Sequence, residues 1–393
     1  PPQFDCGHDG GRRMTAASPI IQGWCPGALR PMASGDGLVV RVRPRGGRLT
    51  SEQAAKIAQL AAVHGNGLID LSSRANVQLR GVTESSHAAL IDGLRTMGLI
   101  DASAEAEGRR NIVVAPFWQD GDGTQNLAAE LTAALAAPDA PQLPGKFGFV
   151  LDTASAPVLR DVSADIWLET GPNGLLLCAQ GAAFGKPVKP ETAVAEAIAL
   201  AHWFMNQGGV TAGRGRMAAL LKRVALPPEH TEPRAAALPQ PVVGPVSAGS
   251  LVAFEFGQMR AETLAALAKS GPLRVTPWRM LLVEGALPHI PGLITDATDP
   301  LLRVIACTGA PGCVQALQPT RALARALAPY VPQGAVLHVS GCAKGCAHPT
   351  PVQTLTATAQ GFDLIHHGTA AAAPDTIGLS AETLLTLFSN RDA

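Results

Sequence analysis

Four of the seven cysteines in this 393-residue chain form two close pairs. Five residues separate Cys307 from Cys313 in "CTGAPGC", and three separate Cys342 from Cys346 in "CAKGC". Cysteine thiolates are the ligands of iron–sulfur clusters, and four of them complete a 4Fe–4S cubane. Glycines beside the cysteines would let the backbone pass close to sulfide and turn its N–H groups toward it. The spacing and the glycines therefore favour an iron–sulfur cluster.

Two other interpretations of the paired cysteines stay open. Structural zinc sites favour C-x2-C to C-x4-C spacing in both halves, and five residues in one pair departs from that pattern. The four cysteines could also be buried residues without a role. Four of the seven cysteines would then have to be grouped in two close pairs by chance, which is improbable. A disulfide framework does not fit a large chain that we expect to be cytoplasmic. We rank the iron–sulfur cluster ahead of zinc.

The remaining cysteines and the first residues give weaker indications. Cys178 lies in the apolar run "GLLLCAQG", so we expect a small buried hydrophobic residue. The sequence does not decide the role of Cys25. We expect residues 1–22 to be a disordered leader, with Met14 a candidate start and Cys6 without a role. No basic-then-apolar leader and no run of about 20 apolar residues is present, so we expect a cytoplasmic protein without a membrane span.

A second group of candidate residues consists of arginines and amides on two expected strands. The first set lies on or just after one strand: Arg41, Arg43, Arg45 and Arg48. Alternation along an extended strand places the first three of these on one face. The second set shares one face of another strand: Arg74, Asn76, Gln78 and Arg80. For any single arginine a solvated strand face is the commoner explanation.

The whole set is harder to explain as a solvated face, because charged residues make up only 16% of the chain. Arginine binds carboxylates through two parallel hydrogen bonds, so a face with several arginines suits a ligand with many carboxylates. Tetrapyrroles of the sirohaem and corrin pathways are such ligands. Lys+Arg and Asp+Glu are both 31, so the chain lacks the basic excess of a nucleic-acid-binding protein.

An internal repeat must position these residues. The stretches 37–82 and 249–286 each predict a strand, a turn with glycine, an alanine-rich helix and a second strand. Thr50 with Gln53 predicts a capped helix start, and Gly65 predicts its end. The sequence therefore predicts two related strand–helix–strand units, each followed by a larger α/β region.

The larger regions run from about 111 to 243 and from about 301 to the end. In the first we expect strands at 145–152, 164–171 and 174–181, and a helix over 190–209. In the second we expect a helix over 319–332, and the strand "VLHVSG" directly before Cys342. The proline-rich stretch 226–249 is the best linker candidate.

Several of these motifs resemble the signatures of the sirohaem nitrite and sulfite reductase superfamily. "ACTGAPGCVQA" with "HVSGCAKGCAHP" resembles its cluster signature, and "VVRVRPRGGRLTSEQ" and "DLSSRANVQLRGV" resemble its other two main signatures. "RRNIVV" and "PGKFGF" resemble minor ones, and all occur in the expected order. The resemblance implies an α+β fold that is duplicated, with two ferredoxin-like half-domains and two larger α/β domains related by pseudo-two-fold symmetry. It implies these boundaries: leader 1–22, half-domain 23–100, larger domain 101–243, half-domain 244–297 and cluster-binding domain 298–393.

The same resemblance implies roles for individual residues. Four cysteines would hold a 4Fe–4S cluster: Cys307, Cys313, Cys342 and Cys346. In the reductases the residue matching Cys346 also bridges to the sirohaem iron. Arg74, Asn76 and Arg80 would hold the carboxylates of the macrocycle. Arg41 and Gln78, which share the strand faces with them, are further candidates for substrate binding. Arg43 and Arg110 would face the reacting group.

The chain departs from the reductases between the "RN" and "GKF" elements. Residues 112–145 contain no lysine or arginine, so the lysines that bind the anion in the reductases are missing. Without these charges, reduction of a bound anion is hard to explain. "GWCPGALRPMASGDGLVVR" and "GCAKGCAHP" instead resemble the precorrin-3B synthase family, a branch in which the tetrapyrrole is the substrate.

That branch implies an oxygen-dependent monooxygenase of aerobic cobalamin biosynthesis. It would hydroxylate precorrin-3A at C20 and close a γ-lactone, using dioxygen and an electron donor that we expect to be NADH-linked. The family is understood to use the cluster together with a mononuclear non-haem iron, which needs histidine and carboxylate ligands. His348 is the first candidate ligand, ahead of His338, His366 and His367. Each is more often an ordinary histidine than a ligand.

Two alternative functions stay open. One is a sirohaem-dependent assimilatory nitrite or sulfite reductase, which would share the fold, the cluster and the pocket. The other is a cluster-bearing electron-transfer or scaffold protein, which would leave the arginine faces unused. We expect no nucleic-acid or membrane partner.

Overall fold

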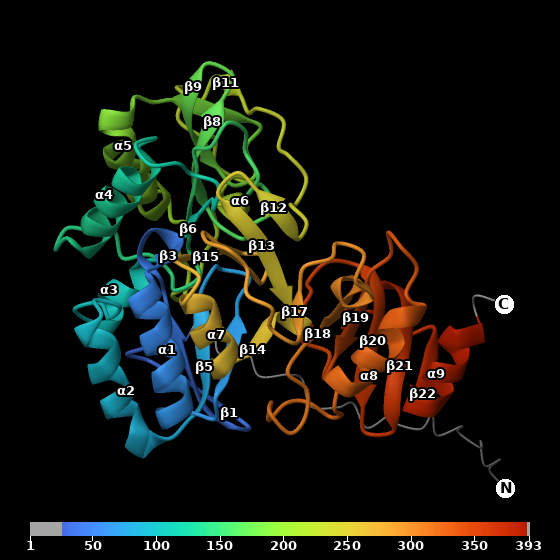
Figure 1. The fold of residues 1–393 in the computed structure, drawn as a ribbon. Helices are drawn as coiled ribbons and strands as arrows, with labels where there is room; N and C mark the ends of the chain where they lie inside the picture. Colours follow the sequence, from blue (N-terminus) through green and yellow to red (C-terminus); the bar gives the residue numbers. More distant parts are fainter. Residues whose placement is uncertain (1–25, 391–393) are drawn as a thin grey trace, which may run out of the picture. The chain divides into compact units, whose positions relative to one another are not determined.

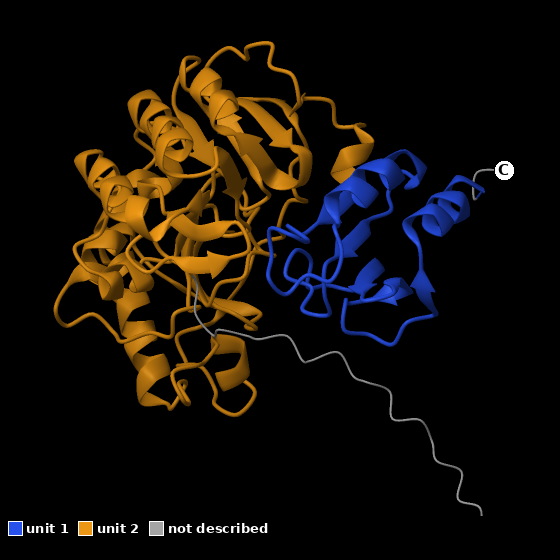
Figure 2. Ribbon diagram, turned by 90° about the horizontal axis from the view of Figure 1, so that it is seen from below, with its two compact units in different colours: residues 1–21, 303–393 blue, residues 22–302 orange. Residues whose placement is uncertain are grey.

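The computed structural model describes residues 26–390, which form two compact units, residues 26–302 and residues 303–390 (Figure 2). The predicted leader 1–22, with Cys6 and Met14, lies outside the described residues, and so does Cys25. Within the described part of the chain, no helix is both long enough and apolar enough to cross a membrane.

The first ferredoxin-like half is a five-stranded sheet with the order β1–β2–β5–β4–β14. Its strands are β1 Met32–Ser34, β2 Gly37–Val42, β5 Val77–Val82, β4 Leu68–Leu71 and β14 Gln258–Arg260. The helices α1 (Ser51–His64) and α2 (Glu84–Thr96) lie against it (Figure 1). The predicted cap of α1 is confirmed, since Thr50 Oγ1 accepts from the Gln53 backbone N–H at 3.1 Å while Gln53 Oε1 accepts from the Thr50 N–H at 3.0 Å.

The second half repeats this arrangement with the order β12–β13–β16–β15–β3, and β17 also pairs with β13. Its strands are β12 Gly244–Val246, β13 Gly249–Phe254, β16 Met280–Val283, β15 Leu273–Val275, β3 Arg48–Leu49 and β17 Leu293–Ile294. Its helix α7 (Ala261–Ala268) follows β14 just as α1 follows β3. The predicted duplication of the strand–helix–strand unit is confirmed.

The two halves exchange a strand. β3 belongs by sequence to the first half but pairs with β15, where Leu49 lies opposite Leu273. β14 belongs by sequence to the second half but pairs with β4, where Met259 lies opposite Ile69. Because each exchanged strand directly precedes the helix of its own half, the exchange brings α1 and α7 into contact. Neither half therefore completes its sheet alone.

Each half is followed by a larger α/β region, and the two regions have the same strand plan. In both, two parallel pairings are followed by two antiparallel ones, and the first region adds a third antiparallel pairing between β10 and β11. The first has the strands β6 Ile112–Val114, β7 Phe149–Asp152, β8 Ile166–Gly171, β9 Gly174–Ala179, β10 Phe184–Pro187 and β11 Glu232–Pro233. The second has β18 Val304–Ala306, β19 Leu337–Ser340, β20 Val352–Thr358, β21 Gly361–Gly368 and β22 Thr376–Leu379. The predicted duplicated α+β fold is confirmed.

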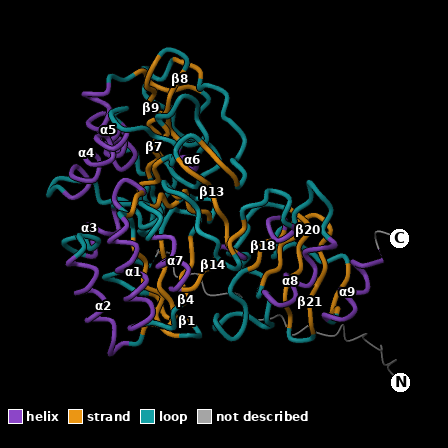
Figure 3. The backbone as a smooth tube through the Cα atoms, in the orientation of Figure 1, coloured by secondary structure: helices purple, strands orange, loops and turns teal. Residues whose placement is uncertain are grey.

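Helices accompany both larger regions. Those of the first are α3 Ala104–Arg109, α4 Thr124–Ala136, α5 Pro190–Asn206 and α6 Met217–Leu220, and those of the second are α8 Arg321–Leu327 and α9 Ala381–Ser389. The single-turn 3-10 helices are η1 Arg45–Gly47, η2 Glu255–Gly257, η3 Pro300–Arg303 and η4 Ala328–Tyr330. α4 and α5 lie side by side against the six-stranded sheet of the first larger region (Figure 3). Phe204 of α5 packs against Phe147, with ring centroids 4.8 Å apart.

The interior of the first larger region also holds the remaining described cysteine. Cys178 on β9 is fully buried, and burial raises the pKa of its thiol to about 12. The prediction of a small buried hydrophobic residue is confirmed.

Asp152 at the end of β7 predicts a pH dependence of stability. Burial raises the pKa of this carboxyl to about 6, and its Oδ2 accepts from the backbone N–H groups of Val158 and Leu159, each at 2.7 Å. Between about pH 4 and pH 6 the folded state keeps a proton that the unfolded chain has lost, so stability falls as pH rises through this window. The loss amounts to about 2 kcal/mol.

Asp152→Asn should remove this loss, because the amide resembles the neutral carboxyl. Urea unfolding at pH 4.5 and pH 7.5 measures it, with the exposed Asp139→Asn as the control. An unchanged pH dependence in Asp152→Asn would contradict the assignment.

Candidate functional site

The strand plan of residues 303–390 brings two of the paired cysteines together. Cys307 directly follows β18, and Cys342 lies two residues beyond the end of β19. These strands are parallel neighbours, with Ala306 opposite Val339, so their carboxyl ends meet at one edge of the sheet. The strand predicted before Cys342 is confirmed.

The two cysteine loops also touch each other. The backbone N–H of Gly341 donates to Cys307 Sγ at 3.1 Å, and the N–H of Leu317 donates to the Gly341 carbonyl at 2.8 Å. A Cβ atom at position 341 would lie 2.8 Å from the Ala316 Cβ and 3.3 Å from Cys307 Sγ. Only glycine fits here without a shift, which agrees with a backbone that must approach the sulfur atoms closely.

The thiols lie within electrostatic reach of one another. Burial, and then the charges of the neighbouring cysteines, raise the pKa of Cys342 and of Cys346, while Lys344 between them acts in the opposite direction. If all four thiols were ionised they would repel each other, and the iron atoms of a cluster would offset that repulsion.

A single metal ion fits the described residues less well than a cluster. Within residues 26–390, no three histidine, cysteine, aspartate or glutamate side chains form a group that could hold one ion. Zinc bonds of about 2.3 Å would require sulfur atoms about 4 Å apart. A cubane takes one thiolate at each of four iron atoms and so accepts a wider set. The four-cysteine ligand set stays a prediction.

The candidate histidines fall into two groups. The ring of His338, buried on β19, lies 5.9 Å from the ring of His348, whose Nε2 is 2.7 Å from Thr350 Oγ1. His366 and His367 are exposed on β21. The structure thus places His348, the first choice, beside His338. The second iron site stays a prediction.

The arginine candidates lie in the other unit, residues 26–302. β2 ends at Val42, so Arg41 lies within the strand, whereas Arg45 lies in η1. The prediction that Arg41, Arg43 and Arg45 share one face of a strand is therefore wrong. The chain turns at Gly46, whose φ of 58° lies in the left-handed region that favours glycine.

Three predicted substrate-binding residues, Arg41, Gln78 and Arg80, are held by partners inside the protein. Arg41 donates twice to Gln78 Oε1, at 3.0 and 2.6 Å, across the β2–β5 pairing. Arg80 is 5% exposed and binds both oxygens of Asp36, at 2.8 and 2.6 Å, and one of Asp70, at 3.0 Å. Burial opposes the charge of Arg80, but these carboxylates outweigh it and raise its pKa.

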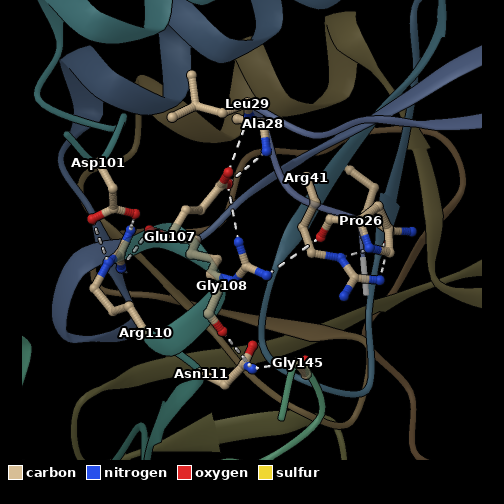
Figure 4. A network of polar contacts seen from close by, with 12 residues as sticks. Pro26, Ala28, Leu29, Arg41, Asp101, Glu107, Gly108, Arg110, Asn111 and Gly145 are labelled. Atoms are coloured by element: carbon tan, nitrogen blue, oxygen red, sulfur yellow. Dashed lines mark hydrogen bonds and ion pairs between the residues drawn. The ribbon is translucent and has the colours of Figure 1, made fainter. Parts of the chain in front are cut away.

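Arg43 and Arg110 form a buried network with two carboxylates (Figure 4). Arg43 pairs with Glu107 at 3.0 Å, and the side chains are 4% and 5% exposed. Arg110 binds both oxygens of Asp101, at 2.9 and 2.7 Å, and donates to the Arg43 carbonyl at 3.1 Å. Carboxylates thus already compensate both charges, and the predicted catalytic roles of these arginines stay untested.

Arg74 and Asn76 line a small cavity of about 10 Å³ together with Asn111, Gly148 and Ser163. Arg74 Nη2 donates to the Lys146 carbonyl at 3.1 Å, and Asn76 is 5% exposed. A cavity of this size holds about one water molecule, whereas sites that enclose a cofactor measure about 300–1,000 Å³. Among the second-strand candidates, it is Arg74 and Asn76 that the structure brings to a cavity.

The polar face occurs in only one of the duplicated halves. In the first half Asp70 lies opposite Gln78, and in the second half Arg274 lies opposite Leu282. Counting from these equivalent pairs, the counterparts of Arg74, Asn76, Gln78 and Arg80 are Trp278, Met280, Leu282 and Glu284. The buried pair Arg80–Asp70 thus corresponds to the charge-reversed pair Glu284–Arg274. One half carries a cationic face, and its repeat carries a mostly apolar one.

The sequence reading missed the carboxylates that hold the arginines. They are Asp36, Asp70, Asp101 and Glu107. The available signal is the composition: in a chain with 31 basic and 31 acidic side chains, arginines near the core require carboxylate partners.

Residues 30–97 match the model of the nitrite/sulfite reductase ferredoxin-like half domain. The chain is 28% identical to the precorrin-3B synthase of Sinorhizobium sp over 92% of its own length and 86% of that protein. The chain thus resembles the nitrite and sulfite reductases in its first half-domain and a precorrin-3B synthase along most of its length. The predicted resemblance to the precorrin-3B synthase branch is also confirmed, because that similarity covers nearly the whole chain.

Two further proteins match less of the chain or match it more weakly. The chloroplastic ferredoxin–nitrite reductase of Zea mays is 35% identical over 80 residues, which is 20% of this chain and 14% of that protein. The solved structure of the Mycobacterium tuberculosis NirA protein has a TM-score of 0.59 and 19% identity. That match covers 89% of this chain and 79% of the NirA chain, and it shows the shared fold.

Proposed function

We propose that this protein is a tetrapyrrole monooxygenase of the precorrin-3B synthase type. It would hydroxylate precorrin-3A at C20 with γ-lactone formation, in the cytoplasm, using dioxygen and a reduced, NADH-linked donor. The observation that carries the proposal is the similarity to a precorrin-3B synthase along 92% of the chain. Arg74, which lines the small cavity on the polar face of the first half, would provide a positive charge for a substrate that carries carboxylates.

The four cysteines at the carboxyl edge of β18 and β19 would hold a 4Fe–4S cluster, which supplies single electrons when bound. The Gly341 N–H that already donates to Cys307 Sγ would stabilise the negative charge on the sulfur. For the proposed mononuclear non-haem iron, His348 beside His338 is the candidate position.

The residues of the first half would bind and orient the substrate. Arg74 and Asn76 would hold one carboxylate-bearing part of the macrocycle and so fix the position of C20. Arg41, Gln78 and Arg80 would support that face through their own hydrogen bonds. The buried Arg43 and Arg110 would stabilise the fold beneath that face through their ion pairs with Glu107 and Asp101. They would also face the reacting group of the substrate.

Purification without oxygen tests the proposal. The expected spectrum is a broad iron–sulfur shoulder. In the reaction with precorrin-3A and oxygen, the product should gain the mass of one oxygen atom.

The alternative function is that of a sirohaem-dependent nitrite or sulfite reductase, which the half-domain match favours. Sharp sirohaem bands in the purified protein would reject the monooxygenase and support that alternative.

Arg74→Ala should weaken tetrapyrrole binding by about tenfold or more, because hydrogen bonds to charged groups contribute about 1.5–3 kcal/mol. The iron content should not change, since Arg74 and the cysteines belong to different compact units. Anaerobic absorbance titration measures the affinity. Arg95→Ala on α2, an exposed arginine paired with Asp92, is the control. Equal affinity in both variants would count against the pocket.

A further inference from the structure

Lys344 lies at the centre of the loop that joins the second cysteine pair. The N–H of Gly345 donates to the Cys342 carbonyl at 3.5 Å, so residues 342–345 form a tight turn. Gly345 has a φ of 61°, in the left-handed region that favours glycine, and the next residue is Cys346. Since Lys344 is two positions from each cysteine, its Cα lies within about 7.6 Å of the Cα of either one. Lys344 is half-buried, and it is the only lysine in residues 303–390.

Backbone donors already point at two of the cysteine side chains. The N–H of Gly341 donates to Cys307 Sγ at 3.1 Å, and the backbone of Lys344 makes a hydrogen bond with Cys342. Hydrogen bonds to ligand sulfur and nearby charges are among the factors that set the reduction potential of an iron–sulfur cluster. Lys344 supplies one of each, a hydrogen bond from its backbone and a positive charge from its ammonium group.

The ammonium group of Lys344 acts on both cysteines of its loop. Burial raises the pKa of Cys342 and of Cys346, whereas the Lys344 charge acts in the opposite direction on each thiol. The charge therefore favours the more negative state of this site. Because the side chain is half-buried, water and salt screen its charge less than they would screen a fully exposed one.

We propose that Lys344 raises the reduction potential of the four-cysteine site and so favours electron transfer to it. This role rests on the 4Fe–4S cluster of the proposed function. When the reduced donor gives up one electron to the site, the site gains one negative charge. The ammonium group of Lys344 stabilises that added charge through space, without a bond to metal. Lys344 is thus a residue that tunes the electron-transfer step rather than a ligand.

An anaerobic redox titration of the full, cluster-loaded chain tests this role, with dithionite as reductant and the EPR signal of the reduced protein as readout. Lys344→Met removes the charge and keeps the backbone N–H and the length of the side chain. At the potential that reduces half of the unchanged protein, the ratio of reduced to oxidised protein should fall about tenfold in Lys344→Met. That change corresponds to a midpoint potential lower by about 59 mV for one electron.

Two further variants serve as controls. Lys344→Arg keeps the charge and should stay within about twofold of the unchanged protein. Arg325→Met removes an exposed charge on α8 of the same unit and should also stay within about twofold. An equal shift in Arg325→Met would overturn the role of Lys344, because the net charge of the unit would then be the cause.

An unchanged midpoint in Lys344→Met with full iron content would overturn the role and leave the proposed function standing. If Lys344→Met loses its iron, Lys344→Gln decides by the same measurement: a lower midpoint supports the role, and an unchanged one overturns it. Loss of iron in both variants would show that Lys344 holds the cluster in place, which overturns the tuning role. Absence of a cluster from the unchanged protein would overturn the ligand set and the role together, whereas sirohaem bands beside a cluster would overturn the proposed function alone.

Discussion

Cys342→Ala is expected to remove the iron–sulfur absorption and the activity together. Cys342 follows β19 at the edge where β18 ends in Cys307, and its loop is tied to Cys307 by the Gly341 N–H. Three thiolates cannot complete the set of four that holds a 4Fe–4S cubane. Iron and sulfide analysis of anaerobically purified protein should therefore fall from about four of each per chain to near zero.

Cys178→Ala provides a matched control for this loss. Cys178 is fully buried in the first larger region, and burial raises the pKa of its thiol to about 12, so we expect no metal bond there. This variant should keep the full cluster and lose about 1 kcal/mol of stability at most. A complete cluster signal in Cys342→Ala would reject the ligand assignment.

Glu107→Ala is expected to destabilise the protein strongly. Glu107 is the carboxylate partner of the buried Arg43, and its oxygens also accept from the backbone N–H groups of Ala28 and Leu29. Removing one partner of a buried ion pair leaves an uncompensated charge, which costs about 3–5 kcal/mol. The thermal midpoint should fall by about 10 °C.

Two further variants identify the cause of this destabilisation. Glu105→Ala, on the same helix but exposed, should change stability by less than about 0.5 kcal/mol. Arg43→Met combined with Glu107→Leu removes both charges and should recover most of the lost stability. Destabilisation by the double variant beyond that of Glu107→Ala would show that the charges themselves are not the reason.

Most of the local structure could be predicted from the sequence, because its signals are short-range. The capping box of Thr50 and Gln53, and the strand before Cys342, lie within a few residues of the features they define. The exchange of β3 and β14 could not be predicted. These strands have two and three residues, too few for an alternating pattern, and their pairing partners lie about 200 residues away.

The candidate site was predictable where its residues share a motif. The cysteine pairs indicated chemistry by type and spacing alone, and parallel neighbouring strands bring two of them together. The partner of Arg43 was not predictable, because Glu107 in "AEAEGRR" looks like part of a solvent-exposed helix, and tertiary contacts bury it.

Crossing of β3 and β14 between the duplicated sheets has a consequence for synthesis on the ribosome. During synthesis, the sheet of the first half lacks its edge strand β14 beside β4 until residue 260 has emerged. The β14–β4 pairing can therefore form only after almost two thirds of the chain has been made. A polypeptide released before that point would expose the unpaired edge of β4, a template on which another copy can add a strand. The order of translation thus makes early termination an aggregation hazard for this fold.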